Sequence, residues 1–354
     1  MVDSPRIIIG ICTFRRPDLL RQLFDAIARQ SVASEAGPPT VFVVDNDPEG
    51  SASWVGSYQG LADVRVEHLG SGNIAVARNY VLDYALQSEQ SFDLLAMIDD
   101  DECPVSDWLV ELVACWRRSR ADVVIGPVMG ALCADAPEWV RHGGYFDHTS
   151  PVPDGPLLEG ISGNAMLFLP SIRGVGLRFD TDLGRSGGED QLFFRLAARH
   201  GLSIRYAARA MVTETVPIER CSFRYLAARS FRMGNTLGLL DVHLPTKTWR
   251  QGLLRVAKSG YWIFSGIWRL VRHSRSGLRG LAPGLLRAIR GFGMVAGVAG
   301  IRYDFYRDRR HHHYANHRTS VGIESLQRAE ADQPRRASRS LGLLGRDLHP
   351  RKLP

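Results

Sequence analysis

The sequence has few cysteines, and none of them forms a paired motif. The five are scattered along 354 residues, at Cys12, Cys103, Cys115, Cys133 and Cys221. No C-x-x-C spacing occurs among them. An odd, scattered set indicates a reducing compartment and argues against both a disulfide framework and a cysteine-ligated zinc site.

The sequence also shows neither a leader nor a long apolar run. Residues 1–12 contain no cationic segment followed by an extended apolar stretch, so we expect no signal peptide. The best apolar run near the C-terminus, from Gly291 to Ile301, is about half the length needed to cross a bilayer. We therefore expect a cytoplasmic protein that is attached to a membrane and does not span it.

Glycine is missing where a phosphate loop would need it. No G-x-G-x-x-G motif follows the first expected strand, and Gly70-x-Gly72 alone is a weak signal, which disfavours a dinucleotide site. The turn Thr13–Pro17 contains no glycine either. A sugar nucleotidyltransferase would normally carry a glycine-rich loop at this turn. The missing glycine therefore disfavours that class of enzyme without excluding it.

Positive charge is concentrated in the C-terminal third. From Val242 to the end there are 22 Lys and Arg against 6 Asp and Glu, a net +16, whereas the rest of the chain has 22 against 31, a net −9. A strongly basic segment predicts an anionic partner. A membrane surface and a nucleic acid both fit this charge, but the sequence contains no recognised nucleic-acid motif.

The first 240 residues alternate between apolar strand patterns and helical patterns. This alternation predicts an α/β fold with a mostly parallel sheet and right-handed crossovers. The expected strands are Ile7–Cys12, Val41–Val44, Val64–Leu69, Phe92–Ile98, Val123–Ile125, Asn164–Leu169, Ile204–Ala207 and Met211–Thr215. The expected helices run from about Leu19 to Gln30, Ile74 to Ala85, Ser106 (as the cap) to Arg118 and Gln191 to His200. We expect residues 130–160 and 215–248 to be loops.

Three consecutive aspartates, Asp99, Asp100 and Asp101, end the strand Phe92–Ile98. Like charges at this spacing repel one another unless a cation neutralises them. The carboxyl end of a strand is where open parallel sheets bind ligands. Oxygen ligands suit Mg²⁺ or Mn²⁺, and Mg²⁺ is usually shared with substrate phosphates. The triplet therefore predicts a metal-bridged phosphate compound.

A second pair of carboxylates, Glu189 and Asp190, directly precedes an amphipathic helix and follows Gly187-Gly188. The glycines allow the backbone to approach a ligand closely. Ordinary acidic capping of the helix N-terminus remains an alternative.

Aromatic and aliphatic residues alternate with Arg and Lys from about Trp249 to Leu270, and again from Leu281 to Ile301. This composition is typical of helices that lie in a lipid headgroup layer. Residues from about His317 onward are polar, Arg-rich and poor in aromatics, which predicts disorder.

Together these segments resemble the inverting family-2 glycosyltransferases of GT-A fold, in particular the succinoglycan glucosyltransferases of the bacterial exopolysaccharide branch. The resemblance covers about residues 5–235, with the motifs in the expected order. The matching motifs are Cys12-Thr13-Phe14-Arg15-Arg16-Pro17, Val44-Asp45-Asn46, Ala77-Arg78-Asn79, Ile98-Asp99-Asp100-Asp101-Glu102, Ser162-Gly163-Asn164 and Gly187-Gly188-Glu189-Asp190.

The resemblance implies a role for each acidic motif. Asp99 and Asp101 correspond to the D-x-D carboxylates that hold Mn²⁺ or Mg²⁺ on the donor diphosphate, with Asp100 facing the ribose. Asp190 corresponds to the general base, and Glu189 would orient the helix start or the acceptor.

Further residues would contact the donor or the acceptor. Asp45 resembles the carboxylate that accepts the uracil N3–H, with Asp47 as the fallback and turn formation as the alternative. The residues expected on the nucleotide side also include Thr13, Arg15 and Arg78, and those expected on the acceptor side are Asn164 and Glu214.

The resemblance thus implies a Rossmann-like GT-A domain over residues 1–240, with a nucleotide-binding half (1–102) and an acceptor-binding half (103–240). Basic amphipathic membrane-associating helices would follow over 241–316, and a disordered tail over 317–354. The expected activity is metal-dependent transfer of a hexose, glucose from UDP-glucose, to a lipid-linked saccharide at the cytoplasmic face of the bacterial inner membrane. A nucleotidyltransferase and a basic nucleic-acid-binding protein are the alternatives, and we expect no nucleic-acid partner.

Overall fold

The structure is a computed structural model that describes residues 4–31, 37–149, 155–157, 159–243, 249–273 and 277–303. The predicted disordered tail, 317–354, lies outside the described residues, as does the end of the predicted helical segment. All five cysteines lie within the described residues, and none of them forms a disulfide.

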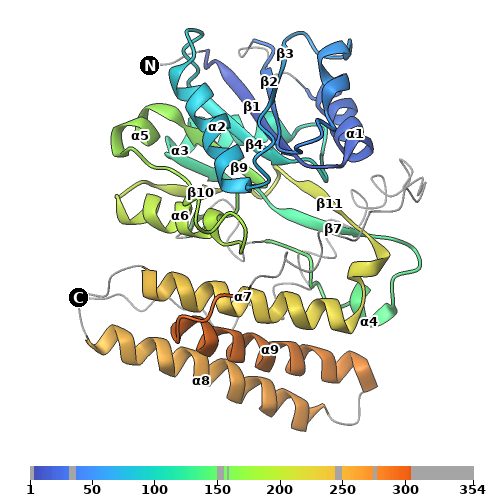
Figure 1. Ribbon diagram of the computed structural model, residues 1–354, viewed down its shortest axis with the longest axis vertical. Helices are drawn as coiled ribbons and strands as arrows, with labels where there is room; N and C mark the ends of the chain where they lie inside the picture. The colour runs from blue at the N-terminus through green and yellow to red at the C-terminus, as the bar shows by residue number, and fades with distance from the viewer. Residues whose placement is uncertain are drawn as a thin grey trace.

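An eight-stranded, mostly parallel sheet forms the centre of the α/β part (Figure 1). Its strands, in spatial order, are β3 (Val64–His68), β2 (Thr40–Asp45), β1 (Ile7–Thr13), β4 (Leu94–Asp99), β9 (Asn164–Phe168), β6 (Val123–Ile125), β10 (Ile204–Tyr206) and β8 (Pro156–Leu157). The first four are parallel to one another, and β9 runs antiparallel to both of its neighbours. The predicted α/β class and parallel sheet are confirmed.

Helices cover both faces of this sheet because its central strands are apolar on both faces. In β1, Ile9 and Ile11 pack with α1 (Pro17–Ala28) and α3 (Trp108–Ser119). Ile8 and Cys12 point the other way, toward α2 (Ile74–Gln87), α5 (Leu169–Val175) and α6 (Glu189–Arg199). The prediction that Ser106 caps α3 is wrong, because the helix begins after Asp107 and no side chain caps it.

A second, three-stranded sheet lies beside the carboxyl end of β4. It consists of β5 (Glu102–Pro104), β11 (Val212–Val216) and β7 (Val128–Leu132). The prediction that residues 130–160 are irregular is therefore wrong in part, since the segment also contains α4 (Glu138–Arg141) and β8. These elements are short and form by pairing with distant strands, so they leave no local pattern.

Three helices form a layer against one end of the α/β part, with α7 nearest to it (Figure 1). They are α7 (Phe223–His243), α8 (Trp249–Arg272) and α9 (Gly277–Val298). The prediction of a loop over 215–248 is wrong, because α7 occupies most of it. Its buried residues do not lie on a single face, since Tyr225 and Leu240 belong to different apolar clusters of the core while Gly234 faces α9.

Glycines allow the helices of this layer to pack closely. Gly234 and Gly238 of α7 lie against the backbone of α9, and Gly266 of α8 lies against Gly284 and Ala288 of the same helix. Within the described part of the chain, one helix segment, Arg279–Val298, is long and apolar enough to cross a membrane, with a mean hydropathy of 1.2. Arginines interrupt the apolar residues of this segment, so the longest uninterrupted apolar stretch in the sequence is short.

Candidate active site

The strand-end carboxylates meet at one edge of the main sheet. The register places Asp99 of β4 beside Cys12 of β1, and Thr13 beside Asp45 of β2. Because these strands are parallel, their carboxyl ends share that edge, where open α/β sheets bind ligands. The convergence of the first, second and fourth strand ends therefore agrees with the expected donor site.

Asp100 and Asp101 are tied to the turn that follows β1. The Asp100 carboxylate accepts hydrogen bonds from Thr13 Oγ1 at 2.9 Å and from the Phe14 backbone N–H at 3.3 Å. Arg16 Nη1 lies 2.8 Å from a carboxylate oxygen of Asp100 and 2.8 Å from one of Asp101. Burial raises the pKa of Asp100 to about 6, against the opposing effect of Arg16. Asp100 thus anchors the turn, and Arg16 is a site residue that our reading of the motif missed.

Arg78 connects the aspartates to the second acidic motif. Its guanidinium donates from Nη1 to Glu189 Oε1 at 2.5 Å and from Nη2 to Asp99 Oδ1 at 3.2 Å. The arginine is 6% exposed. Burial raises the pKa of Glu189 to about 7, and the neighbouring Asp190 adds to that rise. Two motifs that are 90 positions apart in the sequence therefore face one buried cation.

Glu189 and Asp190 are the first two residues of α6, which begins two residues earlier than predicted. Gly187 and Gly188 precede them with φ of 87° and 101°, a left-handed backbone that favours glycine. Asp190 is half-buried, and its Oδ1 accepts the Gln191 backbone N–H at 2.7 Å. The helix start therefore presents the two carboxylates differently: Glu189 is buried against Arg78, and Asp190 is partly open.

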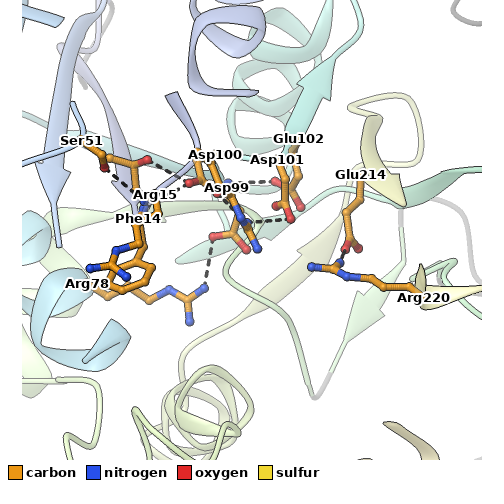
Figure 2. Close-up of polar contacts among 12 residues, drawn as sticks. Phe14, Arg15, Ser51, Arg78, Asp99, Asp100, Asp101, Glu102, Glu214 and Arg220 are labelled. Atoms are coloured by element: carbon orange, nitrogen blue, oxygen red, sulfur yellow. Dashed lines mark hydrogen bonds and ion pairs between the residues drawn. The ribbon is translucent and has the colours of Figure 1, made fainter. Parts of the chain in front are cut away.

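Two further glutamates extend the acidic cluster. Glu102 Oε2 accepts the Asp99 backbone N–H at 2.9 Å, and burial raises the pKa of Glu102 well above its usual value. Glu214 is paired with Glu102 in the register of β11 and β5 and forms an ion pair with Arg220 at 2.9 Å (Figure 2). A side chain at Gly163 would collide with Glu102 Oε1, which explains the glycine of the Ser162-Gly163 motif. No pattern in the sequence indicated the part that Glu102 plays.

The residues expected to read the base form a buried turn. Asp45 is 2% exposed, and its two oxygens accept the backbone N–H groups of Asp47 at 3.0 Å and Ala52 at 2.6 Å. Arg15 forms ion pairs with Asp47 at 3.0 Å and Glu49 at 2.9 Å. Asp45 therefore shapes the turn, and Arg15 is the more exposed donor at this edge.

Asn164 has a place different from the one expected. It is fully buried, and its amide accepts from Trp108 Nε1 at 2.8 Å. The same amide donates to the carbonyl oxygens of Pro127 at 2.9 Å and Ala210 at 2.7 Å. With every polar atom of the side chain used, Asn164 joins three segments of the core and lines no open surface of this structure.

The strand-end carboxylates fit a divalent cation that is shared with a substrate. Among the described residues, no group of three or more His, Cys, Asp or Glu is arranged to hold a metal alone. Asp99 and Asp101 supply two carboxylates. Each of them forms an ion pair with an arginine, Asp99 with Arg78 at 3.2 Å and Asp101 with Arg16 at 2.8 Å. Mg²⁺ is commonly bound by one or two carboxylates together with substrate phosphates. The two carboxylates are therefore suitable ligands for an ion that is shared with a substrate phosphate.

Comparisons with known proteins agree with this geometry. The family model "Glycosyl transferase family 2" matches residues 8–175. The chain is 35% identical over 309 residues to the succinoglycan biosynthesis protein ExoM of Rhizobium meliloti (strain 1021), and the match covers 85% of this chain and 95% of ExoM. The chain belongs to glycosyltransferase family 2. Its α/β architecture is the GT-A fold of that family, and the protein is a glycosyltransferase.

Solved structures of lower similarity were also found. S. aureus TarS 1–349 superposes with a TM-score of 0.47 at 14% identity, covering 83% of this chain and 92% of that one. The same fragment in complex with UDP-GlcNAc gives a TM-score of 0.46 at 13% identity, covering 84% and 93%. Membership of family 2 decides for glycosyl transfer over the nucleotidyltransferase and nucleic-acid-binding alternatives.

Proposed function

We propose that this glycosyltransferase transfers a hexose with inversion, glucose from UDP-glucose, to a lipid-linked saccharide. The observation that carries the proposal is the bridge made by Arg78. It joins Asp99, at the proposed donor site, to Glu189, beside the proposed base. The groups that bind the donor and those that activate the acceptor would therefore lie next to the same guanidinium, that of Arg78, and a single displacement requires such proximity.

Asp99 and Asp101 would hold Mn²⁺ or Mg²⁺ against the donor diphosphate. When bound, the ion supplies charge stabilisation for the departing nucleoside diphosphate. Arg15 and Thr13 lie at the same edge of the sheet, where the nucleotide would bind. Within the proposed domain boundaries, residues 1–102 supply this donor side and residues 103–240 supply the base and the acceptor side.

Asp190 would act as the general base. Asp190 is half-buried at the start of α6 and partly open to an acceptor, whereas Glu189 beside it is buried against Arg78. Asp190 would take the proton from the acceptor hydroxyl as that oxygen attacks the anomeric carbon. Glu189, held by Arg78, would position this loop, and Glu214 would face the acceptor.

The outer face of the helical layer supports a membrane-bound acceptor. Large apolar side chains on α8 and α9 are exposed, among them Tyr261, Phe264, Ile267, Trp268, Val271, Phe292 and Val295. Most of those on α8 recur every three or four residues, so they share one face of the helix. Such a face, flanked by Lys and Arg, suits the headgroup layer of an anionic membrane. We therefore place the enzyme at the cytoplasmic face of a bacterial inner membrane.

The name of the relative ExoM supports a place in exopolysaccharide synthesis. A screen of nucleotide sugars tests the proposal, with binding and slow hydrolysis measured with and without Mn²⁺. We expect UDP-glucose to bind and to be hydrolysed only with the cation. Equal binding of all nucleotide sugars in EDTA would contradict the proposal.

A further inference from the structure

A second cluster of buried charge lies where α7 and α9 meet the α/β part. We call it the arginine cluster: Arg229 and Arg232 of α7, Arg290 of α9, and His148. Arg229 Nη2 donates to His148 Nε2 at 3.1 Å. Burial lowers the pKa of His148 to about 4, and the guanidinium groups of Arg229, Arg232 and Arg290 contribute to this shift. The cluster therefore contains three cations around a neutral imidazole.

Two of these arginines form no ion pair with a carboxylate among the described residues, and the carboxylates that act on them, Glu214 on Arg229 and Glu159 on Arg290, do so without such a contact. Arg229 is 8% exposed, and its Nε is buried without a hydrogen-bond partner in the described part of the chain. The buried Nε of Arg290 is in the same state there. Burial also lowers the pKa of Arg290 to about 10. Buried arginines normally pair with a carboxylate, because an uncompensated charge in the interior costs several kcal/mol.

Two other arginines of the described chain that are largely buried follow that rule. Arg78 pairs with Asp99 and Glu189, and Arg195 pairs with Glu159 and Asp241. Arg229 and Arg290 instead stack on rings, Arg229 at 5.0 Å from the Phe146 centroid and Arg290 at 4.7 Å from that of Trp262. Ring contacts fix the orientation of a guanidinium through its face, so the N–H groups along its edge, among them the Nε of both arginines that has no partner in the described chain, can still bind an anion.

The arginine cluster lies beside the segment Gly187–Gly188, which leads to the proposed base Asp190. It also borders the helical layer. A side chain at Gly187 would lie 2.7 Å from Arg232 Nη1, so that guanidinium touches the loop leading to Asp190. Arg229 acts on the charge of Glu214, since it opposes the rise that burial and Asp101 cause in the pKa of that carboxyl. Arg290 belongs to α9, the central helix of the layer. The cluster thus connects the proposed acceptor side with the proposed membrane side.

We propose that the arginine cluster binds a phosphate group of the lipid-linked acceptor, at a site separate from the donor diphosphate. This inference rests on the proposed function, because it requires an acceptor that carries phosphate. Several guanidinium groups on one anion give short, charge-assisted hydrogen bonds, and arginine matches phosphate geometry well. The donor diphosphate is already accounted for by Asp99, Asp101 and their cation. A lipid phosphate would instead approach from the helical layer, which contributes all three arginines.

The test measures binding of farnesyl diphosphate by calorimetry while UDP and Mn²⁺ saturate the donor site. We expect binding to the wild-type enzyme, and a loss of about tenfold or more in both Arg229→Gln and Arg290→Gln, because each removes charged hydrogen bonds. The matched control is Arg224→Gln, an exposed arginine on the same helix, which should bind like the wild type. Pyrophosphate in place of farnesyl diphosphate shows whether the phosphate alone suffices.

UDP affinity, measured separately in each variant, distinguishes the two proposals. If UDP fails to bind the wild-type enzyme, the proposed function fails, and the farnesyl diphosphate result can still be read alone. If UDP affinity falls as much as farnesyl diphosphate affinity in Arg229→Gln, the cluster serves the donor and the inference is overturned. Unchanged farnesyl diphosphate binding in both glutamine variants also overturns it. Should a glutamine variant unfold, Arg229→Lys and Arg290→Lys keep the charge, and we still expect weaker binding because the planar fork is lost.

Discussion

Two buried charge clusters in this enzyme have opposite compositions. At the strand ends, three carboxylates, those of Asp99, Asp100 and Asp101, form ion pairs with two arginines of the described chain, Arg16 and Arg78. In the arginine cluster, by contrast, Arg229 and Arg290 have no carboxylate partner among the described residues. An excess of carboxylates is stabilised by a cation, and an excess of guanidinium groups by an anion. The comparison supports our two proposals, that the first cluster binds a metal with the donor and that the second binds an anionic acceptor.

The largest effect is expected at the base. Asp190→Asn removes the proton acceptor and keeps the shape of the side chain, so transfer should fall by about 10²–10⁴-fold. Donor affinity should stay within about twofold, because the variant leaves Asp99 and Asp101 intact. The measurement is transfer rate together with UDP-glucose binding. Normal transfer by Asp190→Asn would show that the base is another residue.

The free energy of unfolding should respond differently to the loss of Arg78, which forms ion pairs, and to the loss of Arg229, which forms none with a described carboxylate. Arg78→Met leaves Asp99 and Glu189 buried without their cation, so we expect a loss of about 3–5 kcal/mol in the free energy of unfolding. Arg229→Met removes a guanidinium that forms no ion pair with a described carboxylate, so it should cost less than about 1 kcal/mol. Denaturant unfolding of the ligand-free protein measures both. Equal losses would mean that Arg229 is a structural residue.

Membrane attachment should depend on the outer face of α8. The double variant Phe264→Ser and Trp268→Ser removes two side chains that are 70% and 59% exposed. We expect vesicle binding to weaken by about tenfold or more, from the apolar area that no longer enters the headgroup layer. Tyr80→Ser on α2, far from the layer, is the control (Figure 1). Vesicle flotation that the double variant leaves unchanged would rule out this face.

A further effect is a pH dependence of stability that arises from the arginine cluster. The pKa of His148 is lowered in the folded state to about 4 from an ordinary 6.5, so the unfolded state binds more protons between these values. The stability contributed by neutral His148 is therefore present above pH 6.5 and is lost as pH falls toward 4. As pH falls over that interval, the melting temperature of His148→Gln should decrease less than that of the wild-type protein. An identical decrease in both proteins would contradict the lowered pKa.

Most of the α/β part could be predicted because its signals are local. β1 and β4 are apolar on consecutive residues, as strands covered on both faces must be, and their ends carry the aspartates. The start of α6 was misplaced by only two residues, since Glu189 and Asp190 look equally suitable for a cap and for a first turn. Local composition therefore located both acidic motifs of the candidate site.

The remaining features depend on contacts between distant segments. Arg78 gave no sign that it would reach Glu189, and Asn164 looked like an acceptor residue until its amide proved to be used inside the core. The helix α7 was missed because its buried residues face two partners at once. Arg229 and Arg290 come from separate helices, so no pattern of spacing could bring them together.

The most direct test of the account is a Mn²⁺ titration followed by electron paramagnetic resonance, with and without UDP, in the wild-type enzyme and in Asp101→Ala. The account predicts that UDP makes the wild-type enzyme bind Mn²⁺ tightly, because the diphosphate completes the coordination that Asp99 and Asp101 begin. Asp101→Ala should weaken this binding by roughly tenfold or more, since it removes one of the two carboxylates. Equal Mn²⁺ affinity in the two proteins, or UDP binding that is indifferent to Mn²⁺, would contradict it.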